Sequence, residues 1–332
     1  QRDVARRAGV SRTTVSLVLN GRADASIPEA TRQRVWEAAA ELGHRPNAYA
    51  RGLRGTQTHV IGLLTDDIAT TPYAVQIIKG AQDAAHEAGH TLMIIDTHGE
   101  ADAADEALRM MASWRVDGVV YATDFHRAIT PPDHLSSRPS VLVDCYAPGS
   151  RIPAIVPDEA QGGRTATEAL IEAGHRRIGI ITGPDGYPAS AGRLDGYHAA
   201  IDAAGLTRDP DLIAIGDWWQ ESGYDMTHRL MALDEPPTAI FCCNDWMAMG
   251  AYDALRELRF SIPGDVAVIG FDDRREIADH MHPRLTTVAL PYYEMGRRGV
   301  ELVLDPERLA EASAAAPPTI AIGCPLVRRE SA

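Results

Sequence analysis

Residues 11–19 predict a short helix, one face of which carries side chains suited to contacting DNA bases. The opposite face is an apolar stripe at spacing i, i+3, i+4, made of Val15, Val18 and Leu19. At about 100° per residue, Thr13 and Leu17 point away from that stripe. Arg12 could donate two hydrogen bonds to a guanine, and Leu17 could contact a thymine methyl group. A solvated face with one stray leucine is the alternative, and this helix alone leaves both open.

A second group of polar and aromatic residues follows the predicted strands of the remaining chain. It consists of Asp66, Asp67, Tyr73, Asp144, Arg193, Trp218, Trp219, Asn244, Asp245, Asp272 and Asp273. Ligands of parallel sheets bind beyond the carboxyl ends of the strands, so these side chains are candidates for one pocket. Carboxylates and amides bind hydroxyl groups, and aromatic faces cover the apolar side of a sugar ring. Asp158 and Asp217 are interpreted instead as helix-capping or turn residues.

A doubly wound α/β body is the expected scaffold for this pocket. Short β-branched runs alternate with helical patterns of about 10–15 residues, which is typical of parallel sheets. The expected strands are 59–65, 91–97, 118–121, 140–144, 178–182, 212–216, 239–243 and 267–271. The expected helices include 73–87, 159–173, 193–204 and 246–258. So many strands indicate two Rossmann-like halves, broken near Pro157.

The base-contacting helix belongs to a predicted three-helix headpiece. Gly9 permits a tight turn after the first helix, and Ser11 is the expected N-cap of the second. A third helix is expected from Pro28 to Leu42, with Gly43 as its stop. Its expected buried stripe consists of Val35, Ala38, Ala39 and Leu42. This arrangement is typical of a small all-α helix-turn-helix DNA reader.

The charge distribution supports DNA contact by the headpiece and the basic linker that follows it. The first 55 residues hold ten arginines and five acidic residues, whereas the remaining 277 hold 22 basic and 41 acidic residues. The formal net charge of −14 therefore hides a basic head on an acidic body. Such asymmetry indicates nucleic-acid binding by the basic part. In the linker, Leu53 could wedge between base steps of the minor groove.

Several other function classes are disfavoured. No apolar run approaches the ~18 residues of a membrane span, and the N-terminus has no signal-peptide core, so we expect a cytoplasmic protein. Four cysteines lack metal-ligand spacing and are interpreted as core residues: Cys145, Cys242, Cys243 and Cys324. No phosphate loop, nucleophile elbow or zinc motif is present, so we expect no cofactor, no metal and no enzyme activity. A sugar-binding protein that does not act on DNA is one alternative, disfavoured by the basic head. An NAD-type enzyme is the other, disfavoured by the missing phosphate loop.

Two motifs near the N-terminus resemble the headpiece and hinge of the LacI/GalR (lactose-repressor) family. They are DVARRAGVSRTTVSLVLNG at 3–21 and RVWEAAAELGHRPNAYARGLR at 34–54. The resemblance implies that Arg12, Thr13 and Leu17 contact bases and that Leu53 intercalates at the centre of a palindrome. It assigns phosphate contacts to Ser11, Thr14, Ser16 and Asn20. Asn47 and Arg51, in the basic linker, are further expected phosphate contacts. The family often has arginine where this chain has Leu17, so a known operator sequence does not carry over. A few residues are expected to precede Gln1.

The rest of the chain is similar to the body of the same family, which resembles periplasmic sugar-binding proteins. The similar motifs are SAGRLDGY (190–197), GDWWQESGY (216–224), FCCNDWMAMGAYDAL (241–255), DVAVIGFDD (265–273) and RLTTVALPYYEMGRRGVELVL (284–304). The similarity implies effector contacts by Asp144, Arg193, Trp218, Asn244 and Asp272, and by Tyr73 from the first half. Asp66 joins this set because it follows a predicted strand.

We therefore expect a bacterial, nucleoid-associated transcriptional repressor that binds palindromic double-stranded DNA as a homodimer. A small polar effector, expected to be a mono- or oligosaccharide, would bind between two subdomains and change operator affinity in a direction that the sequence leaves open. The expected domains are a headpiece at 1–45, a hinge at 46–57 and a periplasmic-binding-protein-like body at 58–328. The body is expected to divide into an N-subdomain (58–157 plus 288–318) and a C-subdomain (158–287 plus 319–328). A dimer is favoured over a tetramer because no extended heptad follows the last strand.

Overall fold

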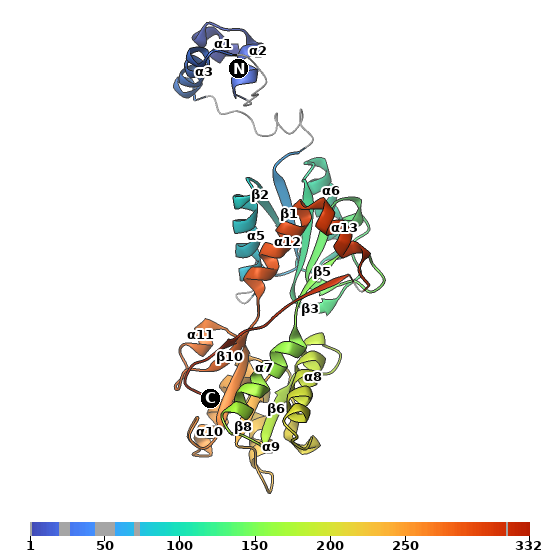
Figure 1. Ribbon diagram of the computed structural model, residues 1–332, viewed down its shortest axis with the longest axis vertical. Coiled ribbons are helices and arrows are strands. Elements are labelled where there is room, and N and C mark those ends of the chain that lie inside the picture. The colour runs from blue at the N-terminus through green and yellow to red at the C-terminus, as the bar shows by residue number, and fades with distance from the viewer. Residues whose placement is uncertain (1, 20–26, 44–56, 70–73, 317) are drawn as a thin grey trace.

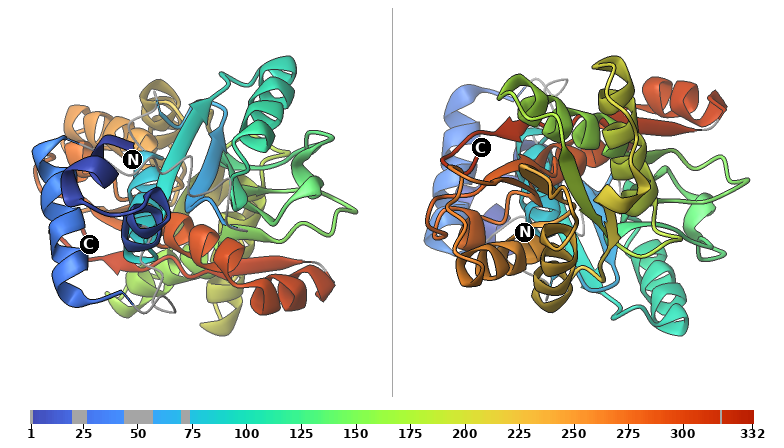
Figure 2. Two further views of the ribbon diagram at one scale, coloured as in Figure 1. Left: turned by 90° about the horizontal axis from the view of Figure 1, so that it is seen from above. Right: turned by 90° about the horizontal axis from the view of Figure 1, so that it is seen from below.

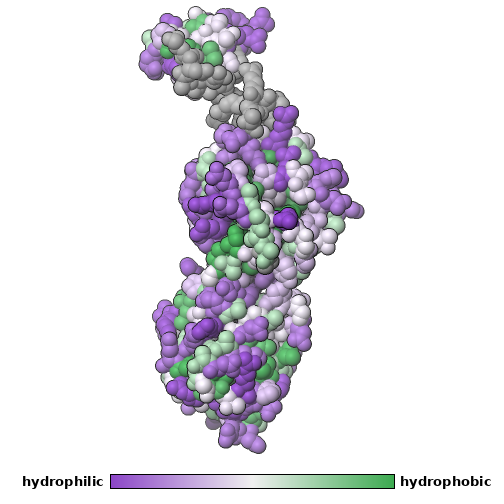
Figure 3. Space-filling view, turned by 45° about the vertical axis from the view of Figure 1, so that its right-hand side comes forward, coloured by the Kyte–Doolittle hydropathy of each residue, from purple (hydrophilic) through white to green (hydrophobic). Residues whose placement is uncertain are grey.

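A small helical unit and a body of two stacked lobes make up the molecule (Figure 1). The structure is a computed structural model that describes residues 2–19, 27–43, 57–69, 74–316 and 318–332. It confirms the expected fold class, a short helix-turn-helix headpiece followed by a two-sheet α/β body. The body narrows where its lobes meet (Figure 3). Among the described residues, no helix is long and apolar enough to span a membrane.

The headpiece has its own small core. Its helices are α1 (Arg2–Ala8), α2 (Arg12–Leu19) and α3 (Glu29–Glu41). The core is formed by Val4, Ala5, Ala8, Val15, Val18, Leu19, Val35, Ala38 and Ala39. Gly9 has a φ of +67°, and the Ser11 hydroxyl accepts the Thr14 amide N–H at 3.0 Å, so both predicted turn and cap are confirmed. The expectation that Leu42 is buried is wrong: α3 ends at Glu41, and Leu42, its C-cap, is 48 % exposed.

The first lobe is a parallel sheet of order β11-β5-β4-β3-β1-β2, with helices on both sides when viewed from above (Figure 2). Its strands are β1 (Val60–Thr65), β2 (Thr91–Asp96), β3 (Gly118–Ala128), β4 (Ser140–Tyr146), β5 (Ala154–Pro157) and β11 (Thr319–Ile322). Its helices are α5 (Val75–Glu87), α6 (Ala101–Ser113), η1 (Leu135–Ser137), α12 (Tyr292–Leu304) and α13 (Pro306–Ala314). Because both faces are covered, the central strands are apolar almost throughout.

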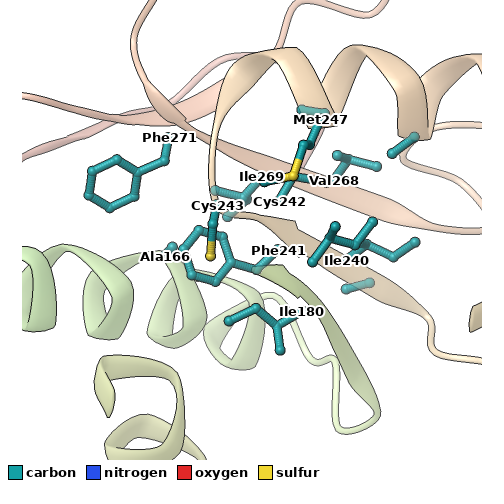
Figure 4. Packing of buried hydrophobic residues seen from close by; sticks show 14 of the residues in the cluster. Ala166, Ile180, Ile240, Phe241, Cys242, Cys243, Met247, Val268, Ile269 and Phe271 are labelled. Carbon is teal, nitrogen blue, oxygen red and sulfur yellow. The ribbon is translucent and has the colours of Figure 1, made fainter. Parts of the chain in front are cut away.

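The second lobe repeats this plan with the order β12-β10-β9-β8-β6-β7, in which only β12 is antiparallel to its neighbour. Its strands are β6 (Ile178–Thr182), β7 (Ile213–Ile215), β8 (Ala239–Cys242), β9 (Ala267–Asp272), β10 (Thr286–Ala289) and β12 (Leu326–Val327). Its helices are α7 (Glu159–Glu172), α8 (Pro188–Ala203), η2 (Pro210–Leu212), α9 (Gln220–Met231), α10 (Asp245–Glu257) and α11 (Arg275–Ala278). Phe241, Cys243 and Phe271 pack together at its centre (Figure 4), and all four cysteines are buried and free, which confirms their interpretation as core residues.

Every predicted strand is present, but β3 is longer than expected. It continues to Ala128 past a register shift after Ala122, so its end reaches the other lobe. Helix α8 begins at Pro188 and not at Arg193, because proline suits the first turn of a helix. The short strands β5, β10, β11 and β12 were not predicted, since runs of two to four residues carry no periodic pattern.

Three segments connect the lobes: β5 to α7, β10 to α12, and β11 to β12. The last crossing differs from the expected boundary, which gave all of 319–328 to the second lobe. Residues Thr319–Ile322 instead extend the first sheet by parallel pairing with β5. The amide of Asp158 donates to the carbonyl of Ile322 at 2.8 Å, so two of the crossings lie side by side.

One carboxylate holds the chain where it enters the first lobe. Asp117 accepts the amide N–H of Thr58 at 2.8 Å and that of His59 at 2.7 Å. The Thr58 hydroxyl donates to the carbonyl of Arg115 at 2.8 Å. Nε2 of His90 lies 3.4 Å from the same Asp117 carboxylate. The residues that follow 44–56 are therefore fixed to the first lobe.

Candidate functional site

A cavity of about 360 Å³ lies between the lobes. The ends of β3 and β4 form its first-lobe wall, and α8 with the ends of β8 and β9 forms its second-lobe wall. Five of the predicted effector contacts line it: Asp144, Arg193, Trp218, Asn244 and Asp272. Its volume lies within the range of ~300–1,000 Å³ of small-molecule sites, at the carboxyl ends of parallel strands.

Asp144 is the most unusual group of the cavity. It lies in β4 with a φ of +59° and is 1 % exposed. Neither of its carboxylate oxygens has a hydrogen-bond partner among the described residues. Burial, together with the nearby Glu159 carboxylate, raises the pKa of Asp144 well above its ordinary value. An unpartnered buried carboxylate is costly, and ligand hydroxyl groups would supply the missing donors.

Arg193 compensates the other acidic groups of the cavity. Its Nε donates to Glu159 at 2.7 Å, and a second nitrogen lies 3.5 Å from Asp272. The guanidinium also donates to the carbonyl of Cys243 and lies 3.7 Å from the centre of the Phe271 ring. Burial lowers the pKa of Arg193, but the two carboxylates outweigh burial and the pKa is raised. Arg193 is therefore a fixed cation in the second-lobe wall.

Backbone conformation and one glycine place the indole of Trp218. Trp218 has a φ of +77°, and Asn244 donates to its carbonyl at 2.8 Å. The ring lies against Gly183, where an added Cβ would come within 2.0 Å of the indole. Asn244 also accepts the amide N–H of Met247 at 2.8 Å as the N-cap of α10. Asn244 therefore positions Trp218 and caps a helix from the same place in the cavity wall.

Asp272 ends β9 with a φ of +105° and faces two arginines. Arg193 lies 3.5 Å away, and Arg274 lies 3.7 Å away. Burial raises the pKa of Asp272 to about 6, although both arginines oppose the increase. The group therefore changes charge within the physiological pH range.

The other predicted strand-end acids do not line the cavity. Asp66 accepts hydrogen bonds from Arg127 and from the amide of Asp124. Asp245 is buried and accepts the Thr287 hydroxyl at 2.6 Å, which makes it a structural group. Asp67 lies 3.3 Å from His98, and Asp273 pairs with Arg329 at 2.7 Å. Tyr73 lies outside the described residues. The turn interpretation is confirmed: Asp158 accepts the amide of Gln161, and Asp217, which does line the cavity, accepts that of Trp219.

Several cavity residues were missed by sequence reasoning. They are Phe125, His126, Glu159, Tyr187, Ala189, Trp246, Arg274, Leu290 and Tyr292. Phe125 and His126 lie in the part of β3 that was not predicted. They contact the second lobe, with His126 3.6 Å from Glu159 and the Phe125 ring 5.9 Å from that of Tyr187. Among these residues, Tyr187 could have been suspected from the sequence, because it lies in the predicted loop GPDGYPASA between a strand and a helix.

The headpiece presents the predicted DNA face to solvent. Ser11, Arg12 and Thr13 are exposed, and Thr14, Ser16 and Leu17 are partly exposed. Ser11 is at once the N-cap of α2 and a predicted phosphate contact. Four further predicted DNA contacts lie outside the described residues: Asn20, Asn47, Arg51 and Leu53.

Both parts of the chain match known families. Residues 2–47 match the model of bacterial regulatory proteins of the lacI family, and residues 167–332 match that of the periplasmic binding protein-like domain. The chain is 37 % identical over 312 residues to the HTH-type transcriptional repressor PurR of Proteus mirabilis, covering 92 % of this chain and 89 % of the relative. It is 37 % identical over 310 residues to the ribose operon repressor of Escherichia coli K12, covering 91 % of each.

Solved structures are similar over the whole chain. The lac repressor dimer bound to operator and the anti-inducer ONPF is 27 % identical, with a TM-score of 0.77 and coverage of 99 % of this chain and 97 % of that one. The complex of the transcriptional regulator CelR with cellobiose is 31 % identical, with a TM-score of 0.65 and coverage of 100 % and 99 %.

Proposed function

The chain belongs to the LacI family of bacterial regulatory proteins and is a transcriptional repressor, and from this we propose that a sugar bound between its lobes controls its operator affinity. The observation that carries the proposal is Asp144, a buried carboxylate that lines the cavity without a hydrogen-bond donor. Two vicinal hydroxyl groups of a sugar match its two oxygens.

A purine is the second candidate, because repressors named PurR are among the relatives. A planar base is best held between parallel rings. The aromatic pairs of the cavity are instead tilted, at 79° between Tyr187 and Trp218 and 52° between Trp219 and Trp246. Neither pair therefore offers two parallel ring faces that could hold a planar base on both sides.

In the proposed complex, a homodimer places two α2 helices in successive major grooves of a palindromic operator. Arg12, Thr13 and Leu17 contact bases, and Leu53 wedges the minor groove. The proposed phosphate contacts are Ser11, Thr14, Ser16, Asn20, Asn47 and Arg51. Effector binding changes the angle between the lobes, and the difference in lobe geometry shifts operator affinity by a coupling free energy of ~1–3 kcal/mol.

The proposal is tested by operator binding of the full chain, with the operator obtained by in vitro selection. Fluorescence anisotropy of the labelled operator is measured with mono- and disaccharides and, separately, with hypoxanthine and guanine. A sugar-dependent change in operator affinity supports the proposal. A response to the nucleobases alone would identify a purine effector, and the dimer is checked by sedimentation.

Arg12→Ala is expected to weaken binding by ~1–3 kcal/mol at one base pair of the operator and to abolish the preference there. Competition among operators mutated at each position identifies that base pair. Arg34→Ala, which removes a positive charge from an exposed position of α3, is the matched control and should leave base preference unchanged. If Arg12→Ala weakens binding equally to all operator sequences, Arg12 contacts a phosphate and not a base.

Sugar affinity is expected to rise about tenfold between pH 5 and pH 7, because the pKa of Asp272 is about 6 and sugar hydroxyls donate to the ionised carboxylate. The free energy of unfolding changes in the opposite direction with pH. A carboxyl whose pKa is raised on folding stabilises the folded state below its unfolded pKa, and this stabilisation is lost as the pH rises through about 6. Calorimetric titration in buffers of different ionisation enthalpy measures both affinity and proton release. Tighter binding at pH 5 would contradict the role of Asp272.

A further inference from the structure

The buried and exposed parts of the cavity differ in chemistry. Asp144, Arg193 and Asn244 are at most 6 % exposed, whereas Tyr187 is 38 % and Trp219 is 65 % exposed. Three polar groups of the cavity therefore lie deep, and the rings of Tyr187 and Trp219 lie nearer its mouth. A single sugar ring on the deep groups leaves the outer rings uncovered.

Trp219 and Trp246 form one wall of this mouth. Their ring centroids are 6.2 Å apart and the rings are tilted by 52°. Trp219 is the N-cap of α9, and Trp246 lies in the first turn of α10, so the starts of two helices fix the wall. Although they are consecutive, Trp218 lies on Gly183 beside Arg193, and Trp219 lies beside Trp246. The two indoles thus serve different parts of the cavity.

Polar groups flank this wall. The guanidinium carbon of Arg274 lies 5.7 Å from the centre of the Trp246 ring. Asp217 lines the cavity, and a hydrogen bond with Ser222 lowers its pKa, so it is an ionised acceptor at neutral pH. Apolar faces beside one donor and one acceptor match the C–H face and the hydroxyl groups of a pyranose ring.

We propose that Trp219 and Trp246 form a second sugar subsite, so that the effector contains at least two linked pyranose rings. This inference rests on the proposed sugar effector. The inner ring binds Asp144, Arg193 and Asp272, and the outer ring stacks on Trp219. Trp219, without a contact to the inner ring, sets the preference for chain length.

Isothermal titration calorimetry of the full chain with cellobiose, maltose and lactose, and with glucose and galactose, tests the subsite. We expect a disaccharide to bind at least about tenfold more tightly than its monosaccharides, equivalent to about 1.4 kcal/mol. Trp219→Ala should remove that advantage and leave monosaccharide affinity within about twofold, while Trp219→Phe keeps most of the advantage. Trp114→Ala, which changes a half-exposed indole outside the cavity, is the control and should alter neither.

Two results would overturn the subsite and leave the sugar effector in place. One is equal affinity for monosaccharides and disaccharides, and the other is wild-type disaccharide affinity in Trp219→Ala. Binding of hypoxanthine or guanine in place of every sugar, or no binding of any of these sugars, would remove the proposed effector and the subsite with it.

Discussion

Arg193→Met is expected to lower the free energy of unfolding by about 3–5 kcal/mol, because it leaves the buried Glu159 carboxylate without its arginine and Asp272 with Arg274 alone. Arg193 is 3 % exposed, donates to Glu159 at 2.7 Å and lies 3.5 Å from Asp272. Methionine has a similar length and fills the space beside Phe271, so the decrease in the free energy of unfolding comes more from the lost charge than from lost packing. Urea unfolding followed by circular dichroism measures it. The variant should also fail to respond to effector.

Arg164→Met is the matched control for this prediction. Arg164 pairs with Glu168 at 2.7 Å on the exposed surface of α7, and its loss should cost at most ~1 kcal/mol. Adding Glu159→Gln to Arg193→Met should recover part of the stability, since it removes one of the stranded charges. If Arg193→Met costs no more than Arg164→Met, the buried network is not what stabilises the second-lobe wall.

Asp144→Asn is expected to weaken sugar binding about 100-fold, because donating sugar hydroxyls favour the ionised carboxylate and the substitution turns two charge-assisted hydrogen bonds, each contributing ~1.5–3 kcal/mol, into neutral ones. The same variant should melt at a higher temperature than wild type at pH 7. Burial raises the pKa of Asp144, so the ionised form opposes folding, and asparagine removes this penalty. Operator affinity without effector should stay unchanged. Calorimetry and thermal melting provide the two measurements.

Asp133→Asn, at an exposed position of the same lobe, is the control and should change neither quantity. A lower melting temperature for Asp144→Asn would mean that Asp144 has a partner that stabilises its charge. Unchanged sugar affinity would exclude it as a contact.

The parts of the fold that could be predicted are those with strong local patterns. The stripe of Val15, Val18 and Leu19 identified α2, and β-branched runs such as 178–182 identified the central strands. The position of polar residues after such strands was enough to bring Asp144 and Asp272 to one cavity, although they lie in different lobes. Polar residues at strand ends are good candidates for a ligand site, because the carboxyl ends of parallel strands lie at one edge of the sheet.

The remaining site residues depend on contacts that no local pattern encodes. Phe125 and His126 reach the second lobe only because β3 continues beyond a register shift. Glu159 is the first residue of α7, where an acidic residue is usually exposed to solvent. Here it is buried and accepts a hydrogen bond from Arg193. Asp66 is the opposite case: it follows a strand as predicted, but it forms an ion pair with Arg127 and does not line the cavity. Long-range pairing decides each of these positions.

The attachment of the chain at Asp117 has a mechanical consequence. Its carboxylate binds the backbone N–H groups of both Thr58 and His59, so the chain has no free play where it enters the first lobe. If that lobe turns against the other, this anchor moves with it along an arc. Slack at this point would absorb the movement, whereas a fixed attachment moves the entry point of the chain together with the lobe. A single, largely buried carboxylate would then fix the point at which the DNA-binding part of the chain joins the body.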